Sequence, residues 1–574
     1  MSADDKNDVA ANESDVFLTS SSTNCQTPTT KDEAKELSSM LISDETVDDK
    51  PAVVLSNLEF TLVFVGLALA VFIVSLDMTI ISVALQVIAS EFSALDQINW
   101  VGTAYFLTST AFIPVYGQLC DVFGRKSIFL IAITIFEIGS LLCGASNSMN
   151  MLIVSRAIAG LGGSGIFSLT MIIIGDLTTA RDRGKYLGLI GSTYGIASIV
   201  GPLMGGAFVD HIGWRWVFYI NLPIGVVTVA AVLVFLKLRH ITEDTLSASI
   251  QKIDWAGCFF LVSFVICLLI PVQGGGTQYA WDSPTVIVLF VAAFLLLAAF
   301  IYIEGWVAKN PLVPFVLMKN RYAVATFVTS AFVGAAFFIL VFYVPLWFQI
   351  VLGSTATDAG VKTLPLMMGM VVSSIGSGAA ASITGYFYPY LPVGAVMTAV
   401  GSGLIITMDE NAATWKQVIF LLICGLGVGM SFQMCMVSSQ VSVEPHLLAV
   451  SVSTNNFIQT IGLAIGVAIC SALFNHNLPI NVQEALNNIN LTLPDALLNG
   501  APSALIFQDP SVLHNAVFIA EGGELQKALI HGYLVTLSHL FWLPVGFAGT
   551  WIITSFFVKK ERIEQGAEVA MGAA

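Results

Sequence analysis

Long apolar stretches alternate with short polar connections along most of the 574 residues of this chain. We count about fourteen such stretches, which begin near residues 60, 98, 127, 150, 186, 216, 256, 284, 323, 359, 390, 415, 447 and 533. A helix needs ~20 predominantly apolar residues to cross the hydrocarbon core of a bilayer. The pattern therefore predicts an all-α polytopic membrane protein with about 14 transmembrane helices.

The connections divide the predicted helices into groups. Six closely connected helices occupy residues 60–239, two extra helices occupy the linker 240–320, and six more occupy residues 321–558. We expect residues 1–59 to be a disordered acidic tail, residues 475–532 a large outer loop, and residues 559–574 a second tail. Two six-helix bundles around a central site are typical of transporters that expose this site to each side of the membrane in turn.

Basic residues in the connections predict the orientation of the helices. Fourteen Lys and Arg residues fall on the same side as the N-terminus, against four on the other side, which are Arg215, Lys362, Lys416 and Lys527. Cytosolic loops are enriched in Lys and Arg, so we expect both termini in the cytosol. The loop 475–532 is then outside, and its Asn-Leu-Thr sequon makes Asn490 a candidate glycosylation site.

The composition fits a membrane protein and excludes other classes. The chain is 56% hydrophobic and 11% charged, with a mean hydropathy of +0.83, which is outside the range of soluble domains. Residues 1–59 hold 13 acidic and 4 basic residues, and so most of the net charge of −15, which indicates no nucleic-acid-binding surface. Eight cysteines without a Cys-x-x-Cys pair favour neither a disulfide framework nor a metal site.

Glycine-rich segments do not indicate a nucleotide cofactor. Residues 160–165 fit the pattern Gly-x-Gly-x-x-Gly, but this pattern must follow a soluble strand, and here it lies inside a predicted span. No Gly-Lys-Ser/Thr phosphate loop occurs in the sequence. We therefore expect a protein that is not an enzyme, needs no cofactor and takes its energy from an ion gradient.

The leading candidate for a functional site is an ionisable side chain inside the first span. A charged group in the bilayer costs several kcal/mol unless it is paired, so Asp77 is expected to have a function. Arg156 in the fourth span reaches a similar depth at 1.5 Å rise per residue. We expect the two to pair, with Asp77 binding the proton. Glu137 in the third span is a possible second acid, whereas Glu304 is expected to extend to the membrane surface.

A second cluster lies in the loop after the second span, and consists of Gly117, Asp121, Gly124, Arg125 and Lys126. Glycine permits a tight turn between helices, and Asp121 can accept hydrogen bonds from Arg125 or from a neighbouring helix N-terminus. We expect the cluster to act as a latch at the cytosolic mouth. Simple anchoring by positive charge is the alternative, but it accounts only for Arg125 and Lys126.

Small residues form a stripe along the fifth span. Ala197, Gly201 and Gly205 recur every four residues, and Gly206 follows. Such a stripe allows close helix packing in lipid. Pro202 removes one backbone hydrogen bond and can kink the helix, so the stripe is either a pivot between the two bundles or a packing surface alone.

These motifs resemble those of the major facilitator superfamily. Residues 117–126 are similar to its Gly-x-Leu-x-Asp-x-x-Gly-Arg-Lys loop, residues 156–162 to its fourth-helix motif, and residues 201–206 to the fifth-helix motif of antiporters. Residues 76–85 and 214–223 resemble the fourteen-span drug:proton antiporter group. The resemblance implies the major facilitator fold and proton-coupled antiport, as in fungal-type efflux pumps. Gln459 stands where many relatives carry a basic residue.

The second half of the chain has almost no embedded charge and many aromatic and methionine residues. Such side chains suit a pocket for bulky apolar or amphipathic ligands, and the alternative is that most of them face lipid. They include Phe337, Phe338, Phe342, Tyr343, Trp347, Phe348, Met367, Met368, Met370, Phe432 and Met434.

We therefore predict a monomeric, proton-coupled antiporter of the plasma membrane that exports hydrophobic or amphipathic small molecules, such as toxins, drugs or secondary metabolites. One alternative is an importer of basic amino acids or other small cations in the vacuolar membrane, which should have more acidic groups in its central cavity. A transporter-like sensor that signals through residues 1–59 is a third possibility. All three work in a lipid bilayer without nucleic acid.

Overall fold

The fold of the described residues is almost entirely helical. The computed structural model describes residues 56–94, 97–236, 246–275, 279–488, 524–560 and 562. These residues contain no strand, only an isolated bridge between Gly275 and Tyr279. The predicted all-α class is therefore confirmed. The candidate glycosylation site Asn490 lies outside the described residues.

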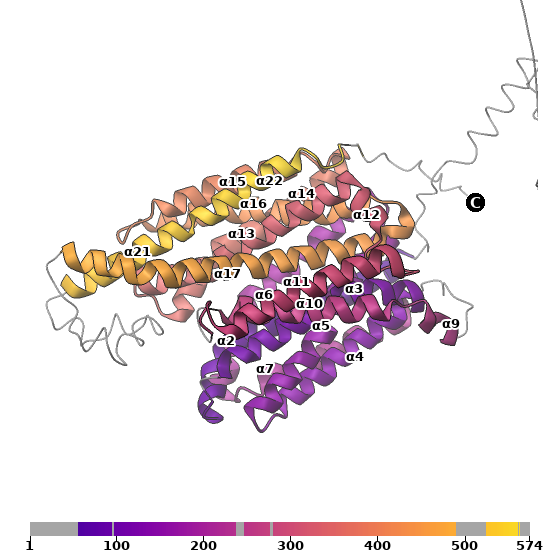
Figure 1. Cartoon of the computed structure of the whole chain (residues 1–574), viewed down its shortest axis with the longest axis horizontal. Coiled ribbons are helices and arrows are strands. Elements are labelled where there is room, and N and C mark those ends of the chain that lie inside the picture. Colours follow the sequence, from indigo (N-terminus) through magenta and orange to yellow (C-terminus); the bar gives the residue numbers. More distant parts are fainter. Residues whose placement is uncertain are drawn as a thin grey trace, which may run out of the picture. The chain divides into compact units, whose positions relative to one another are not determined.

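The helices form two sets joined by a linker (Figure 1). The N-terminal set comprises α2 (Asn57–Glu91), α3 (Ile98–Phe123), α4 (Arg125–Gly144), α5 (Met149–Leu177), α6 (Arg183–His211), α7 (Trp216–Tyr219) and α8 (Asn221–Phe235). The linker comprises α9 (Leu246–Gln251), α10 (Trp255–Gly274), α11 (Pro284–Tyr302), the π-helical turn η2 (Ile303–Val307) and α12 (Phe315–Lys319). The C-terminal set comprises α13 (Arg321–Val351), α14 (Ala356–Thr384), α15 (Tyr390–Ile406), α16 (Thr414–Val441), the 3₁₀ turn η3 (Pro445–Leu447), α17 (Leu448–Asn488), α21 (Glu524–Leu540) and α22 (Trp542–Ser555).

Twelve helical segments of the described chain are long and apolar enough to cross a membrane. Two pairs of helices, α7 with α8 and α21 with α22, each count as one such segment. The helix α15 is apolar but shorter, with 17 residues, and α3 packs against α5 along its length. With α3 and α15, these segments account for the predicted helices. The domain boundaries drawn from the sequence remain predictions.

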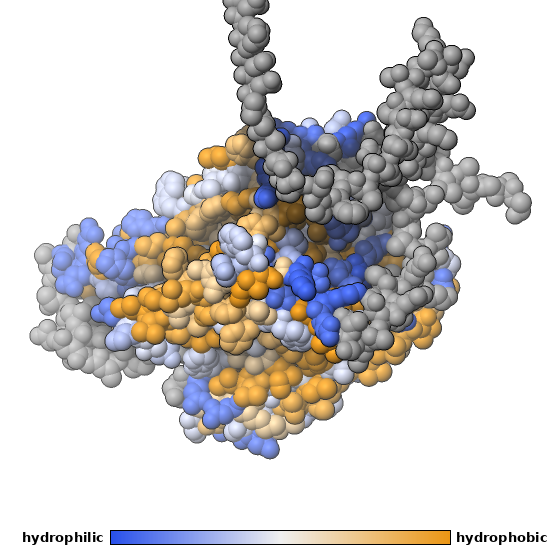
Figure 2. Space-filling model, turned by 45° about the vertical axis from the view of Figure 1, so that its right-hand side comes forward, coloured by the Kyte–Doolittle hydropathy of each residue, from blue (hydrophilic) through white to orange (hydrophobic). Residues whose placement is uncertain are grey.

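The outer surface has the apolar character that a lipid-facing protein needs. Figure 2 shows apolar residues over much of the visible face, with hydrophilic residues at its edges and in a patch right of its centre. Large apolar side chains are well exposed on several helices, including Val226 on α8, Phe294 on α11 and Ile383 on α14. In lipid such exposure carries no hydrophobic penalty, and helix contacts depend instead on close packing of small residues.

The two sets pack together where α6 meets α14 and where α3 meets α17. A Cβ atom on Gly188 of α6 would lie 2.6 Å from the carbonyl oxygen of Ser374 on α14. A Cβ on Gly117 of α3 would lie 2.8 Å from Cβ of Ser453 on α17. Both contacts lie toward the end of the helices that carries the α3–α4 turn, which we call the Gly124 end. The helices therefore approach most closely where only glycine fits.

Hydrogen bonds reinforce this contact at the Gly124 end. Arg181, in the turn before α6, donates to the carbonyl oxygens of Ser382 and Ile383 at 2.5 and 2.6 Å. Gln433 on α16 donates to the carbonyl oxygen of Gly184 on α6 at 3.1 Å. The N-terminal and C-terminal sets are thus joined at this end by backbone contacts and charge-assisted hydrogen bonds.

The linker packs on both sets. Apolar side chains of α10 form one buried cluster with residues of α3 and α17, and Figure 1 draws α10 and α11 across the junction of the sets. Gln118 of α3 donates to the carbonyl oxygen of Asn310 at 2.7 Å. The expectation for Glu304 is wrong, because its side chain is only 5% exposed. Its carboxylate accepts hydrogen bonds from the backbone N–H groups of Leu312 and Val313. These bonds hold the segment after η2 against the helix end.

Candidate functional site

A buried ion pair lies at the centre of the N-terminal set. Arg156 of α5 donates from Nη1 to Oδ2 of Asp77 on α2 over 2.5 Å. The side chains are 2% and 0% exposed. Asp77 and Arg156 thus form the pair expected from the sequence, and each charge offsets the free-energy cost of burying the other.

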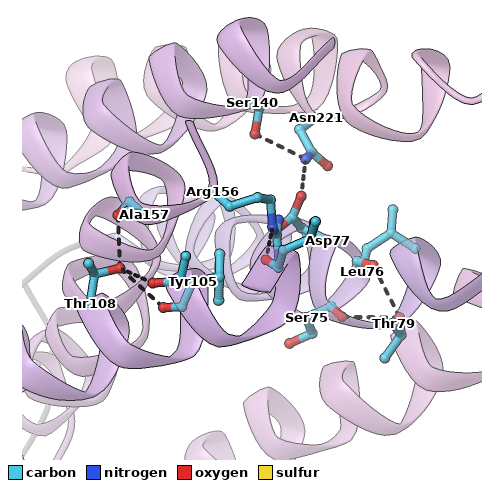
Figure 3. Close-up of polar contacts among 12 residues, drawn as sticks. Ser75, Leu76, Asp77, Thr79, Tyr105, Thr108, Ser140, Arg156, Ala157 and Asn221 are labelled. Atoms are coloured by element: carbon cyan, nitrogen blue, oxygen red, sulfur yellow. Dashed lines mark hydrogen bonds and ion pairs between the residues drawn. The ribbon is translucent and has the colours of Figure 1, made fainter. Parts of the chain in front are cut away.

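Neutral groups surround the ion pair and hold it in place (Figure 3). The second carboxylate oxygen of Asp77 accepts from the amide of Asn221 on α8 at 3.3 Å, and the same amide donates to Ser140 of α4 at 3.2 Å. Arg156 donates from Nε to the carbonyl oxygen of Val101 at 3.2 Å and lies 4.3 Å above the ring of Tyr105. The guanidinium group thus keeps two other favourable contacts if Asp77 becomes neutral.

The small-residue stripe of α6 positions the ion-paired helix. Thr79, two residues after Asp77, donates to the carbonyl oxygen of Ala197 at 3.0 Å. A Cβ atom on Gly201 would lie 2.9 Å from that of Thr79, and a Cβ on Gly205 would lie 2.8 Å from the carbonyl oxygen of Ile80. Three members of the stripe therefore pack on α2 beside the ion pair. Gly206, in contrast, has open space where a side chain would be, and Pro202 is only partly buried.

The predicted latch forms an ion cluster at the Gly124 end. Arg125 contacts Asp121 at 2.8 Å and Asp176, at the end of α5, at 3.0 Å. Gly124 has a φ of +86°, which favours glycine, and it is the single residue between α3 and α4. Lys126 is not part of the cluster, because it donates to the carbonyl oxygen of Leu233 on α8 at 2.9 Å.

Glu137 lies near the ion pair but is not bonded to it. Both of its carboxylate oxygens are buried, and they lack a hydrogen-bond partner among the described residues. The carboxylate contacts Gly225 of α8, one turn from Asn221, which binds Asp77. The structure thus brings a second carboxyl group beside the first.

Glu91 is the last residue of α2 and lies at the end of the helices opposite Gly124. Trp214 donates from its indole nitrogen to Glu91 at 2.6 Å, and Arg215 contacts the other oxygen at 3.1 Å. The Trp214 hydrogen bond, with help from Arg215, lowers the pKa of Glu91 below its usual value. This bridge ties the end of α2 to the segment before α7.

The buried polar groups of the C-terminal set are neutral. Among the Asp, Glu, Lys, Arg and His residues of the described chain, those buried as whole residues are Asp77, Arg156 and Glu304, none of which belongs to that set. Its helices are joined instead by hydroxyl and amide groups: Ser330 donates to Asn455 at 2.6 Å, and the hydroxyls of Thr326 and Ser438 lie 2.7 Å apart. No group of three or more His, Cys, Asp or Glu that could hold a metal occurs in the residues described.

Only part of the predicted aromatic lining gathers in one place. The rings of Phe337 and Phe432 lie 6.2 Å apart, and Phe337 also contacts Tyr194 of α6 at 6.1 Å. These three rings therefore connect the two sets. Phe342 and Met368 are 56% and 46% exposed, which agrees with the alternative that they face lipid.

Several residues of these sites were missed in the sequence. Asp176 was one of many acidic residues near a span end, and only the fold brings it to Arg125. Asn221 stood in a segment that was noted for its resemblance alone, yet it binds Asp77. A buried amide in a span is as informative as a charge, because it too needs a partner.

Comparisons with known proteins agree with the fold and the motifs. Residues 67–467 match the family described as Major Facilitator Superfamily. The chain is 38% identical to the MFS-type efflux pump MFS1 of Arthroderma benhamiae, over 82% of this chain and 88% of that protein. It is also 38% identical to the MFS-type transporter phomT of Diaporthe leptostromiformis, over 85% and 83%. The crystal structure of the human organic anion transporter MFSD10 (TETRAN) aligns with a TM-score of 0.53 and 14% identity, covering 85% of this chain and 99% of that one.

Proposed function

Because this chain belongs to the Major Facilitator Superfamily, we propose that it is a proton-coupled antiporter that exports uncharged amphipathic small molecules across the plasma membrane. The names of similar proteins, such as efflux pump bfoC of Aspergillus brasiliensis at 32% identity, support export. Proton coupling is supported by one observation above all, the buried pair of Asp77 and Arg156. We propose that no cofactor is needed and that a monomer is sufficient.

The proposed cycle turns on whether Asp77 is ion-paired or protonated. When Asp77 takes up a proton, its attraction to Arg156 falls, and the guanidinium group can rest on the carbonyl oxygen of Val101 and the ring of Tyr105. Neutral Asp77 still accepts from Asn221. A membrane potential of 100 mV supplies about 2.3 kcal/mol per proton, enough for a gradient of roughly fiftyfold of a neutral substrate.

The sidedness follows from the basic residues. Arg125, Lys126, Arg181 and Arg183 all lie at the Gly124 end, so we propose that this end faces the cytosol. The close contacts at this end then close the cytosolic path, and this conformation releases substrate outward. The ion cluster of Asp121, Arg125 and Asp176 stabilises the closed state within the N-terminal set.

Import of a cationic amino acid has less support. A cation in the central path needs a desolvated carboxylate near it, and the C-terminal set has no buried one among its described residues. We therefore favour export of uncharged molecules over import of basic amino acids across the vacuolar membrane.

The proposal is tested with purified protein in liposomes that enclose a pH-sensitive dye. Adding an uncharged aromatic ketone or lactone outside should drive protons out of the lumen, so the dye should report alkalinisation. Asp77→Asn should abolish this signal, and a protonophore should collapse it. Proton movement that persists in Asp77→Asn would contradict the coupling role, and a wild-type protein that moves no protons with any compound of the panel would contradict antiport.

A further inference from the structure

Three buried side chains with unpartnered polar atoms lie where the two sets of helices meet. Gln440 of α16 and Asn456 of α17 are each 2% exposed, and Ser168 of α5 is 0% exposed. None of their side-chain oxygen and nitrogen atoms has a hydrogen-bond partner among the described residues. We call these three residues the amide site.

Contacts at two glycines place the amide site at the junction. A Cβ atom on Gly175 of α5 would lie 3.4 Å from Oε1 of Gln440. Ser168 is two turns before Gly175 on the same face of α5, and so lies about 10 Å further along the junction. A second contact involves α17 and α3. A Cβ atom on Gly117 of α3 would lie 3.6 Å from the carbonyl oxygen of Ala449 on α17. Asn456 is two turns after Ala449, so it too faces the N-terminal set.

The neighbouring amides show that this junction can satisfy such groups. Gln433, two turns before Gln440 on α16, donates to Gly184 at 3.1 Å and accepts from Ser374 at 3.4 Å. Asn455, next to Asn456, accepts from Ser330 at 2.6 Å. An amide that is buried without a partner is unfavourable, and most such groups in proteins are bonded. The amide site therefore has hydrogen-bonding capacity that the protein itself does not use.

The chemistry of the site selects its ligand. Two amides and a hydroxyl offer both donors and acceptors, and among the described residues of α16 and α17 no carboxylate or basic side chain is buried. Such a site can bind an oxygen atom of an uncharged molecule, but it cannot compensate a cation. The rings of Tyr194, Phe337 and Phe432, which also cross between the sets, offer an apolar surface for the rest of a molecule.

We propose that the amide site hydrogen-bonds a carbonyl, hydroxyl or phosphoryl oxygen of the uncharged molecules that this protein exports. This inference rests on the proposed export function, because it names the class of molecule that the protein exports. Binding itself needs no proton gradient, so the two can be tested separately.

The test compares three probes of similar size with the full chain in nanodiscs. Triphenylphosphine oxide is neutral and accepts hydrogen bonds, triphenylmethane is neutral and accepts none, and tetraphenylphosphonium is a cation. Equilibrium binding is measured for each, with empty nanodiscs subtracted. We expect the wild-type protein to prefer the oxide, and Gln440→Leu and Asn456→Leu each to weaken oxide binding about tenfold while leaving triphenylmethane binding unchanged.

A matched control separates a specific site from a general effect of removing buried polar groups. Ser431 is also buried on α16 with an unpartnered hydroxyl, but it packs against Gly394 of α15, away from the junction. Ser431→Ala should therefore keep oxide binding.

Three results would overturn the proposal: wild-type protein that binds none of the probes, equal or tighter binding of the cation, or full oxide affinity in both leucine variants. The last result would mean that water alone occupies the amide site. If selective oxide binding is found but the liposomes show no coupled proton movement, the binding site stands and the antiport function fails.

Discussion

The two sets of helices bury polar groups of different kinds. The N-terminal set holds a charged pair, Asp77 and Arg156, that is hydrogen-bonded to neutral partners and lies near the carboxyl group of Glu137. The buried polar side chains described in the C-terminal set are neutral and mostly hydroxyls and amides, some paired as in Ser330 and Asn455 and some without a partner as in Asn456. A buried charge must always have a counter-charge or a proton, whereas a buried amide can exchange partners at a much smaller free-energy change.

This difference suggests a division of labour. A charged pair is suited to binding and releasing one defined ligand, a proton, because the two states differ strongly in electrostatic energy. Neutral amides and aromatic rings are suited to cargo that varies in shape, because hydrogen bonds to neutral groups contribute modestly and can be rearranged. The contacts between α6 and α14 and between α3 and α17 would connect the two tasks.

Breaking each polar pair should reveal the largest difference between the sets. Arg156→Met leaves the carboxylate of Asp77 buried without its counter-charge, and we expect a loss of roughly 3–5 kcal/mol in the free energy of unfolding. Ser330→Ala removes one neutral hydrogen bond and should lose only about 1 kcal/mol. Thermal unfolding of the two variants in the same detergent measures the contrast.

A second change gives the control for this prediction. Adding Asp77→Asn to Arg156→Met removes the unpaired charge, so most of the lost stability should return. If the double variant is no more stable than Arg156→Met alone, the loss arises from packing and not from charge.

The next largest loss of stability should come from disturbing the packing around the charged pair. A side chain on Gly201 would collide with Thr79 beside Asp77, so Gly201→Val should destabilise by roughly 1–3 kcal/mol. Gly206→Val is the matched control on the same helix, because open space surrounds that position. Comparable unfolding temperatures for the two variants would show that the contact between α2 and α6 does not position the charged site.

Adding a charge to the neutral set should change its ligand preference. Asn456→Asp places a carboxylate at the amide site, so tetraphenylphosphonium should bind about tenfold more tightly than in the wild-type protein, or ~1.4 kcal/mol. Oxide binding should weaken in parallel, because one donor has been lost. The same binding measurement in nanodiscs tests this, and Ser431→Ala again serves as the control. Unchanged affinity for the cation would show that position 456 does not face the ligand.

The smallest expected effect concerns the exposed carboxylate of the N-terminal set. The pKa of Glu91 is lowered in the folded state, so its ionised form stabilises the protein at neutral pH, and this contribution disappears as the pH falls below the usual value of 4.5. Glu91→Gln should therefore lower the unfolding temperature slightly at pH 7, and this effect should shrink as the pH falls below 4.5. Glu444→Gln, at an exposed position of the C-terminal set beside His446, should leave the unfolding temperature unchanged at both ends of this pH range.

Much of the fold, and part of the site, could be predicted from the sequence. The apolar stretches predicted the helices because membrane helices must satisfy their own backbone groups, whatever their neighbours. Asp77 and Arg156 could be matched because charges in a bilayer need partners at the same depth. Asp176 and Glu304 could not be placed, since their partners depend on how helix ends meet and on a π-helical turn. The amide site was invisible for the same reason, because amides are common in spans and only packing reveals which lack partners.

The central claim is that the proton and the cargo bind in different sets of helices. Calorimetric titration of triphenylphosphine oxide into the protein, repeated in buffers with different ionisation enthalpies, measures both the affinity and the number of protons released on binding. We predict that the wild-type protein releases protons, and that Asp77→Asn binds the oxide with an affinity within about threefold of wild type but releases none. Loss of oxide binding in Asp77→Asn, or unchanged proton release, would contradict the account.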